Sequence, residues 1–284
     1  MTIAEKIKRK LNKTFTGLVF DEPSHTYRIK NKVLVSTTTY IDKFSQEFNS
    51  YYASENKAKK ILEFNPNDKR NSQYYRKRWE YVNKEATNMG SRIHMYAECW
   101  PDFDTPMCNG EQGVLDFFNW IPDNYELLFI EFRLFDEDYL RAGTMDGLLL
   151  NKDTNQLVIF DFKTNKRNIL EYYSGKKLKE PFKDLPANNL NKYSLQLSDY
   201  MWMIEKNTGY KVEDRWVIWL REGDVAVKDK DRNDSYKIEA VTPDVNEQYF
   251  KLFKLKDYST EMMNDNKSNI STSGKKNRKK QPTT

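Results

Sequence analysis

The sequence predicts an α/β fold in which helices flank one sheet. Three successive segments between residues 125 and 163 are rich in β-branched and aromatic residues, which favour strands. Segments with apolar residues three and four positions apart, typical of amphipathic helices, lie on either side. The order of helix, three strands, helix and strand indicates one domain with a sheet at its centre. At 284 residues and 38% hydrophobic content, the chain can bury such a core.

The N-terminal part is expected to be mainly helical. Ser36 and its neighbouring threonines are good N-caps, so a helix should begin there, after a hairpin around residues 20–35. The other helices are expected over residues 3–11, over 50–100 with a break at 65–67, and over 111–121.

The C-terminal part is expected to hold the sheet. Strands are expected at 125–136, 139–150, 156–163 and 213–220, with shorter ones near 225–228 and 235–240. Helices are expected at 189–207 and 243–258, and the basic stretch 165–188 is irregular. We therefore divide the chain into an N-terminal hairpin and helical region (1–85) packed on a core (86–260), followed by a disordered basic tail (261–284).

Composition narrows the function classes. The formal net charge is +5, and the segment from Asn264 onwards holds six Lys or Arg residues against one Asp, so the rest of the chain is neutral. The tail is either solubilising or a phosphate-binding arm. No stretch is apolar enough for a membrane span, and the N-terminus lacks a secretory signal. We expect a cytoplasmic protein of a bacterium or of a phage-infected cell. In a reducing cytosol the two cysteines, Cys99 and Cys108, are free thiols.

Charged residues in two predicted strands are the first sign of chemistry. Asp161 and Lys163 are two residues apart and share a strand face, while Asp146 lies on the partner strand. Two nearby carboxylates raise each other's proton affinity and require a cation. Lys163 supplies one charge, and Mg²⁺ or Mn²⁺ would supply more. An ordinary Asp–Lys salt bridge on a solvated face is the alternative.

Polar residues on two predicted helices add to this group. His94 lies on the long helix, and Gln196 and Tyr200 are four apart on one face of the helix after the strands. Taken singly, these could be an ordinary helix histidine and the polar edge of an amphipathic helix.

Together these motifs resemble the PD-(D/E)XK nuclease superfamily, in particular its RecB-like exonuclease branch of phage and mitochondrial type. The matching motifs are Gly90 with His94, Gly143 with Asp146, Asp161-Phe162-Lys163, and Gln196 with Tyr200, all in the family's order. Residues 25–41 are similar to an N-terminal stretch of the same branch, and the resemblance covers roughly residues 20–220. It implies a restriction-endonuclease-like α-β-β-β-α-β core with N-terminal helical additions.

The resemblance also implies a mechanism. Asp146, Asp161, the backbone carbonyl of Phe162 and His94 would hold one or two Mg²⁺ or Mn²⁺ ions. Lys163 would position water or stabilise the transition state, with Gln196 and Tyr200 beside it. Glu131 either supports a second metal ion or is an ordinary strand residue.

The resemblance makes DNA, single-stranded or with single-stranded ends, the expected partner. Lysines contact phosphates and aromatic rings stack on bases. The candidate contact residues lie on the long helix and after the last strand of the hairpin: Arg76, Lys77, Arg78, Ser91, Arg92, Lys166, Arg167, Tyr172, Tyr173, Lys176 and Lys177. Each group could equally be a solvated surface.

The resulting expectation is a metal-dependent DNA exonuclease of replication, recombination or repair that yields 5′-phosphates. An endonuclease of the same fold, structure-specific or related to packaging, is the alternative, and an inactive nucleic-acid-binding module is a third reading. Two cysteines exclude a four-cysteine iron–sulfur cluster within this chain. The sequence has no Walker A motif.

Overall fold

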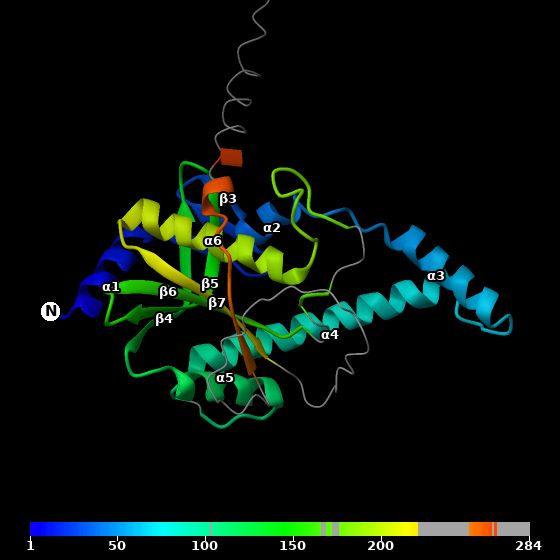
Figure 1. The fold of residues 1–284 in the computed structure, drawn as a ribbon, viewed down its shortest axis with the longest axis horizontal. Helices are drawn as coiled ribbons and strands as arrows, with labels where there is room; N and C mark the ends of the chain where they lie inside the picture. The colour runs from blue at the N-terminus through cyan, green and yellow to red at the C-terminus, as the bar shows by residue number, and fades with distance from the viewer. Residues whose placement is uncertain (103, 166–168, 172–175, 221–249, 263, 266–284) are drawn as a thin grey trace, which may run out of the picture.

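A computed structural model describes the chain except residues 103, 166–168, 172–175, 221–249, 263 and 266–284 (Figure 1). Its named helices are α1 (Ile3–Thr14), α2 (Thr37–Asp42), α3 (Ser50–Phe64), α4 (Ser72–Cys99), α5 (Asn109–Trp120) and α6 (Asn189–Thr208). None of the described helices is both long and apolar enough to cross a membrane.

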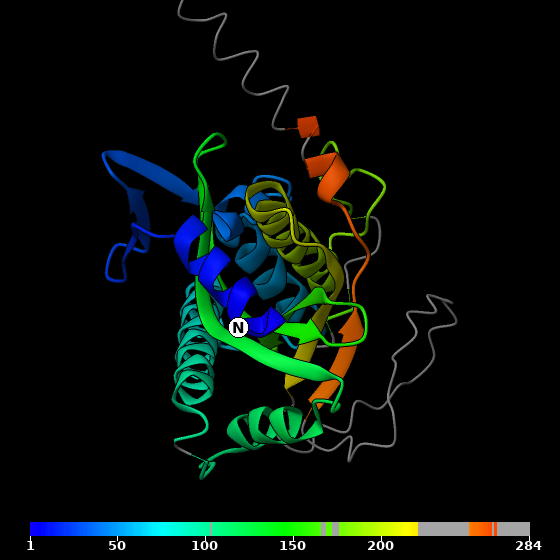
Figure 2. The same cartoon turned by 90° about the vertical axis from the view of Figure 1, so that its left-hand side faces the viewer.

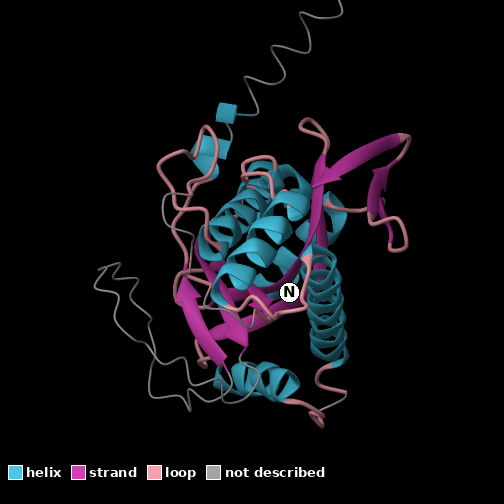
Figure 3. Ribbon diagram, turned by 90° about the vertical axis from the view of Figure 1, so that its right-hand side faces the viewer, coloured by secondary structure: helices cyan, strands magenta, loops and turns pink. Residues whose placement is uncertain are grey.

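The strands form one mixed sheet. They are β1 (Leu18–Asp21), β2 (Thr26–Ile29), β3 (Lys32–Ser36), β4 (Tyr125–Asp136), β5 (Arg141–Asn151), β6 (Gln156–Lys163), β7 (Val212–Leu220) and β8 (Phe250–Lys254). Their order is β1-β2-β3-β5-β6-β7-β8, and β4 pairs with β5 in addition. The β3–β5 and β6–β7 pairs are parallel and the others antiparallel. The β1–β2 hairpin stands out from the body of the sheet (Figures 2 and 3).

Local sequence signals define the two helices nearest the sheet centre. The side chain of Asn71 caps α4 by accepting a hydrogen bond from the Tyr74 N–H. The side chain of Asn188 caps α6 by accepting a hydrogen bond from the Asn191 N–H. Gly209 ends α6 with a φ of 78°, a left-handed conformation that glycine adopts without steric cost.

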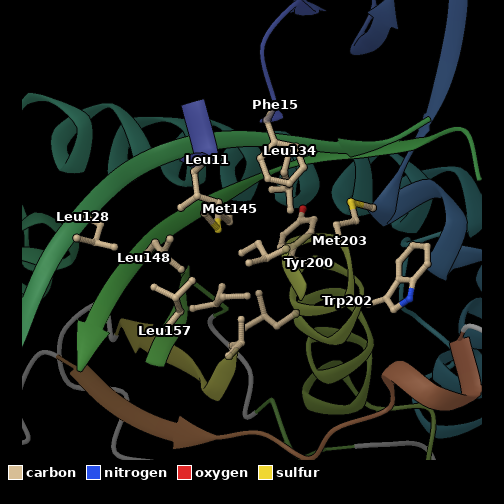
Figure 4. Close-up of a cluster of buried hydrophobic side chains, with 14 of the residues drawn as sticks. Leu11, Phe15, Leu128, Leu134, Met145, Leu148, Leu157, Tyr200, Trp202 and Met203 are labelled. Atoms are coloured by element: carbon tan, nitrogen blue, oxygen red, sulfur yellow. The ribbon is translucent and has the colours of Figure 1, made fainter. Parts of the chain in front are cut away.

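Helices cover both faces of the sheet. Helix α6 lies on one face, and α4 and α5 lie on the other (Figure 1). Leu148 and Leu150 of β5 pack in the cluster with α1 and α6, whereas Leu149 packs in the cluster with α4 and α5. This alternation follows from the period of two along a strand. Tyr200 and Met203 of α6 point toward Leu134 and Met145 of the sheet (Figure 4).

The sheet opens along one edge of β5. On the edge opposite β4, β5 pairs with β3 only at Arg141 and Ala142, and with β6 only from Gly147 onwards. Within the described chain, residues 143–146 therefore have no strand partner on this edge. Opposite them in β4, Glu131 has a φ of 50°, an uncommon conformation for a non-glycine residue in mid-strand. Polar side chains gather at this opening.

The N-terminal region is continuous with the remainder of the fold. The expected hairpin at 20–35 is a three-stranded meander whose third strand joins the main sheet through β5. The boundary expected after residue 85 falls inside α4. Residues 1–85 and 86–260 therefore share one helix and one sheet. Helix α4 extends from beside α3 to the sheet (Figure 1), and β3 pairs with β5.

The C-terminal segment differs most from the sequence prediction. The prediction of a helix at 243–258 is wrong for residues 250–254, which form β8 and pair antiparallel with β7. Order also continues past residue 260, because residues 259–262 are helical and Met262 is buried. Asp265 then accepts hydrogen bonds of 2.8 Å each from Tyr40 and Lys43. The strands expected near 225–228 and 235–240 lie outside the described residues.

Candidate metal and phosphodiester site

Two buried carboxylates lie at the opening of the sheet. Asp146 is 4% exposed in mid-β5, and Asp161 is 1% exposed near the end of β6. Burial of a carboxylate without a partner is costly, so each must have compensating contacts. Asp146 is contacted from β6 and α4, and Asp161 is contacted from its own strand and from α6.

The side chain of Asp146 accepts the hydrogen bond from Phe162 that the backbone of a neighbouring strand would otherwise accept. The last pair between β5 and β6 is Gly147 with Phe160, so the backbone of Phe162 is beyond the ladder. The Phe162 N–H instead donates a 2.6 Å hydrogen bond to Asp146 Oδ2. The N–H and C=O of one extended residue point to the same side, so the Phe162 carbonyl also faces the opening beside Asp146.

Asp161 is held between a lysine and an amide. Its Oδ2 forms an ion pair with Lys163 Nζ. Gln196 Nε2 donates to Asp161 Oδ1 at 3.4 Å and lies 3.3 Å from the hydroxyl of Tyr200. The residues predicted from the strand motif and from the helix motif therefore lie in one network.

Asp146 also belongs to a cluster of candidate metal ligands. His94 Nδ1 lies 2.7 Å from Glu131 Oε1 and 3.4 Å from Asp146 Oδ1. Ligand atoms of these three residues all lie within 4.8 Å of one another. The structure thus brings Glu131 together with His94, while Asp161 faces Lys163 and is not one of the three.

The site perturbs the proton affinity of its members. Burial, together with the nearby Asp146 charge, raises the pKa of Asp161 to about 6. Burial also raises the pKa of Asp146. The Asp146 carboxylate, with help from Glu131, raises the pKa of His94 to about 9 against the opposing effect of burial. For Lys163, burial opposes the charge, but Asp161 and Asp146 outweigh it and raise the pKa.

The charge balance and the donor atoms suit a hard divalent cation. The raised pKa of His94 favours its protonated form in the metal-free protein, and His94 would lose that proton on binding a metal ion. Three carboxylates, of Asp146, Asp161 and Glu131, against the ammonium of Lys163 then leave an excess of two negative charges. Carboxylate oxygens are the ligands that Mg²⁺ and Mn²⁺ prefer, and imidazole is compatible with Mn²⁺. The residues present therefore fit the predicted metal.

Close packing explains one of the two motif glycines. A Cβ on Gly143 would lie 2.5 Å from Tyr200 Cε1 and 2.6 Å from the Tyr200 hydroxyl oxygen. Glycine at 143 is thus what lets the Tyr200 ring lie against β5. A Cβ on Gly90 would meet no atom within 4 Å, so packing does not require glycine there.

The predicted DNA-contacting residues of α4 fall into two groups. Lys77, Arg78 and Ser91 are exposed. Arg76 donates to Ser54 Oγ at 2.9 Å, and Arg92 Nε donates to the buried Glu111 at 2.6 Å. The guanidinium groups of Arg76 and Arg92 therefore help to join α4 to its neighbours.

The basic stretch 165–188 is only partly described. Lys176 and Lys177 are exposed, whereas Lys166, Arg167, Tyr172 and Tyr173 lie outside the described residues. The second half of the stretch packs against α2, because Leu178 and Phe182 are buried in a cluster with Tyr40 and Phe44. It is therefore more than a solvated loop.

Two further groups at the site escaped the sequence analysis. The ring of Tyr193 lies 4.8 Å from Lys163 Nζ, and its hydroxyl donates to Asn165 Oδ1 at 2.6 Å. Tyr27 and Thr144 share a 3.0 Å hydrogen bond beside Asp146. The spacing of three between Tyr193 and Gln196 on one helix face was the available signal for the first.

No protein-family model matches the chain, and no curated protein is significantly similar to it.

Proposed function

We propose that this protein is a divalent-metal-dependent nuclease that hydrolyses phosphodiester bonds of DNA. One observation carries the proposal: Asp146 and Asp161 of adjacent strands, the Lys163 ammonium, His94 of α4 and Gln196 of α6 meet in one buried polar site. An ordinary surface salt bridge would not need two buried carboxylates or partners from both helical layers.

The motif order and the α/β fold support assignment to the PD-(D/E)XK superfamily. Helix α4, strands β4 to β6, helix α6 and strand β7 occur along the chain in the helix, three strands, helix, strand order of that family, with the additional helix α5 between α4 and β4. The site lies on the second and third of those strands, where the resemblance places it. Assignment to the RecB-like branch rests on His94 and on the Gln196 and Tyr200 pair.

Asp146, His94 and Glu131 would hold the metal, with Asp161 and the Phe162 carbonyl available from β6. A bound divalent cation supplies Lewis acidity, which makes water more acidic and neutralises charge on a phosphate. The protein contributes a rigid hairpin that aims its carboxylates at one point. It also contributes a surrounding core that limits access of bulk water.

Lys163 would contact the reacting phosphate or water, and Gln196 would hold the Asp161 carboxylate in place. The Lys163 ammonium can donate to a phosphoryl oxygen as negative charge builds there, or it can hold the attacking water. Gln196 holds the Asp161 carboxylate, and Tyr200 fixes Gln196 from the side of β5. Attack on the phosphorus with departure of the 3′ oxygen leaves 5′-phosphate products.

Cleavage at single-stranded ends is the proposed mode. The test is digestion of end-labelled linear single-stranded DNA with Mg²⁺ or Mn²⁺, beside a covalently closed single-stranded circle. The proposal predicts loss of the linear DNA, an intact circle and no reaction with EDTA. Cutting of the circle would show an endonuclease, and tight binding without cleavage in either metal would indicate a binding module.

A further inference from the structure

The ammonium of Lys163 has a second neighbour besides Asp161. The ring of Tyr193 lies 4.8 Å from Lys163 Nζ. Tyr193 belongs to the N-terminal part of α6. A cation at this distance from an aromatic face is attracted by the ring quadrupole. The contact is partly buried, and such contacts strengthen as water is removed.

Tyr193 is itself held in place through Asn165. Its hydroxyl donates to Asn165 Oδ1 at 2.6 Å, and Asn165 lies two residues after Lys163. The backbone carbonyl of Asn165 accepts a 2.8 Å hydrogen bond from the indole N–H of Trp219 on β7. The ring is thus tied through Asn165 to the strand that pairs with β6 at Lys163.

Lys163 is attracted both by the Asp161 carboxylate and by the Tyr193 ring. In the proposed site Asp161 is also available to the metal ion, so the ring supplies an attraction to the ammonium that does not depend on that carboxylate. The ring of Tyr193 provides an attraction that does not consume a hydrogen-bond donor, since a cation–π contact is made by the charge as a whole. Among the described residues Asp161 is the ion-pair partner of the ammonium, and the ring contact leaves its other N–H donors available to substrate oxygens.

Helix α6 presents its contacts in a regular series. Tyr193 contacts Lys163, Gln196 contacts Asp161 and Tyr200 contacts β5, at successive spacings of three and four residues along one helix face. We propose that Tyr193 is a positioning residue that holds the Lys163 ammonium toward the substrate. The proposal deepens, and rests on, the proposed nuclease function.

The test compares Tyr193→Leu with Tyr193→Phe, which keeps the ring and loses only the bond to Asn165. Tyr210→Leu is the matched control, because Tyr210 is also a partly buried tyrosine at the edge of the same cluster and lies outside the site. Cleavage of single-stranded DNA should show kcat reduced at least tenfold in Tyr193→Leu with KM within twofold. Tyr193→Phe should stay within about threefold of wild type, and Tyr210→Leu should be unchanged.

A second measurement does not depend on activity. In protein carrying ¹³C-labelled lysine, the ε-CH₂ protons of Lys163 should resonate upfield because of the ring, with the signal assigned by its loss in Lys163→Arg. This upfield shift should persist in Tyr193→Phe and disappear in Tyr193→Leu. An unchanged shift in Tyr193→Leu, or equal losses of kcat in Tyr193→Leu and Tyr210→Leu, would overturn the proposal. If wild type cleaves no DNA, the proposed function fails, while the shift still tests the placement of Lys163.

Discussion

Gly143→Ala is the substitution whose effect follows most directly from the packing of the site. A Cβ at this position would lie 2.5, 2.6 and 2.9 Å from three atoms of Tyr200. The Tyr200 side chain is 2% exposed, so it cannot swing into solvent. Either β5 or α6 must move instead. Overpacking of this kind costs about 1–3 kcal/mol of unfolding free energy.

The expected result is a melting temperature lower by roughly 2–10 °C, since 1 kcal/mol corresponds to a few degrees in a protein of this size. DNA cleavage should fall as well, because Tyr200 contacts Gln196 and Gln196 contacts Asp161. Gly90→Ala is the matched control. Its Cβ meets nothing within 4 Å in mid-α4, so this change should stabilise the protein by about 0.5–1 kcal/mol.

A double-mutant cycle isolates the contact between residues 143 and 200. Tyr200→Leu removes the atoms that the new Cβ would meet, at the cost of a cavity of its own. Gly143→Ala combined with Tyr200→Leu should therefore be less destabilised than the sum of the single changes by about 1 kcal/mol or more. Additive effects, or a Gly143→Ala protein as stable as wild type, would refute the reasoning.

Three further predictions concern the charges of the fold and the site. Asp199→Ala should lower the free energy of unfolding in urea by about 3–5 kcal/mol, because it leaves the buried guanidinium of Arg141 without the carboxylate that lies 2.8 Å away. A loss below 1 kcal/mol would contradict this. Saturating Mn²⁺ should raise the melting temperature of wild type but not of Asp146→Asn, with a gain of about 2.7 kcal/mol at a hundredfold excess over Kd; equal shifts would place the ion elsewhere. In EDTA, the free energy of unfolding of wild type should exceed that of His94→Asn most near pH 6, and this difference should be lost as the pH rises through about 9. The reason is that Asp146, and then Glu131, raise the pKa of His94 in the folded protein. That difference should be about 1–2 kcal/mol, since the side chain is 35% exposed and water screens its contacts, and a flat pH profile would contradict the assignment.

The central elements were predictable because their signals are local. Strand composition at β4 to β6, the helical spacing of α4 and the capping residue Ser36 all depend on neighbours a few positions away. The same holds for Asp161 and Lys163, whose spacing of two places them on one strand face. The convergence of His94 and Gln196 on those strands could be expected only through the family resemblance.

Features that depend on distant partners were not predictable from the sequence. Strand β8 exists because β7 offers it a free edge, while its own sequence, FKLFK, has no clean period of two. The positive φ of Glu131, which lies beside Asp146 and His94, occurs in mid-strand at a residue other than glycine. Asn165, two residues after β6, joins the site through a side-chain contact with Tyr193 of α6, which no local pattern encodes. For Tyr193 the local signal is its spacing of three from Gln196.

The most direct test of the central claim is single-turnover cleavage of end-labelled linear single-stranded DNA with Mn²⁺ by wild type, Lys163→Ala and Lys206→Ala. Lys206 is the matched lysine, paired with Asp136 and Asp138 far along α6 from the site. The account predicts shortened products with wild type and Lys206→Ala, and a rate at least a hundredfold lower with folded Lys163→Ala. Cleavage by Lys163→Ala at the wild-type rate, or no cleavage by the wild-type protein with either Mg²⁺ or Mn²⁺, would contradict it.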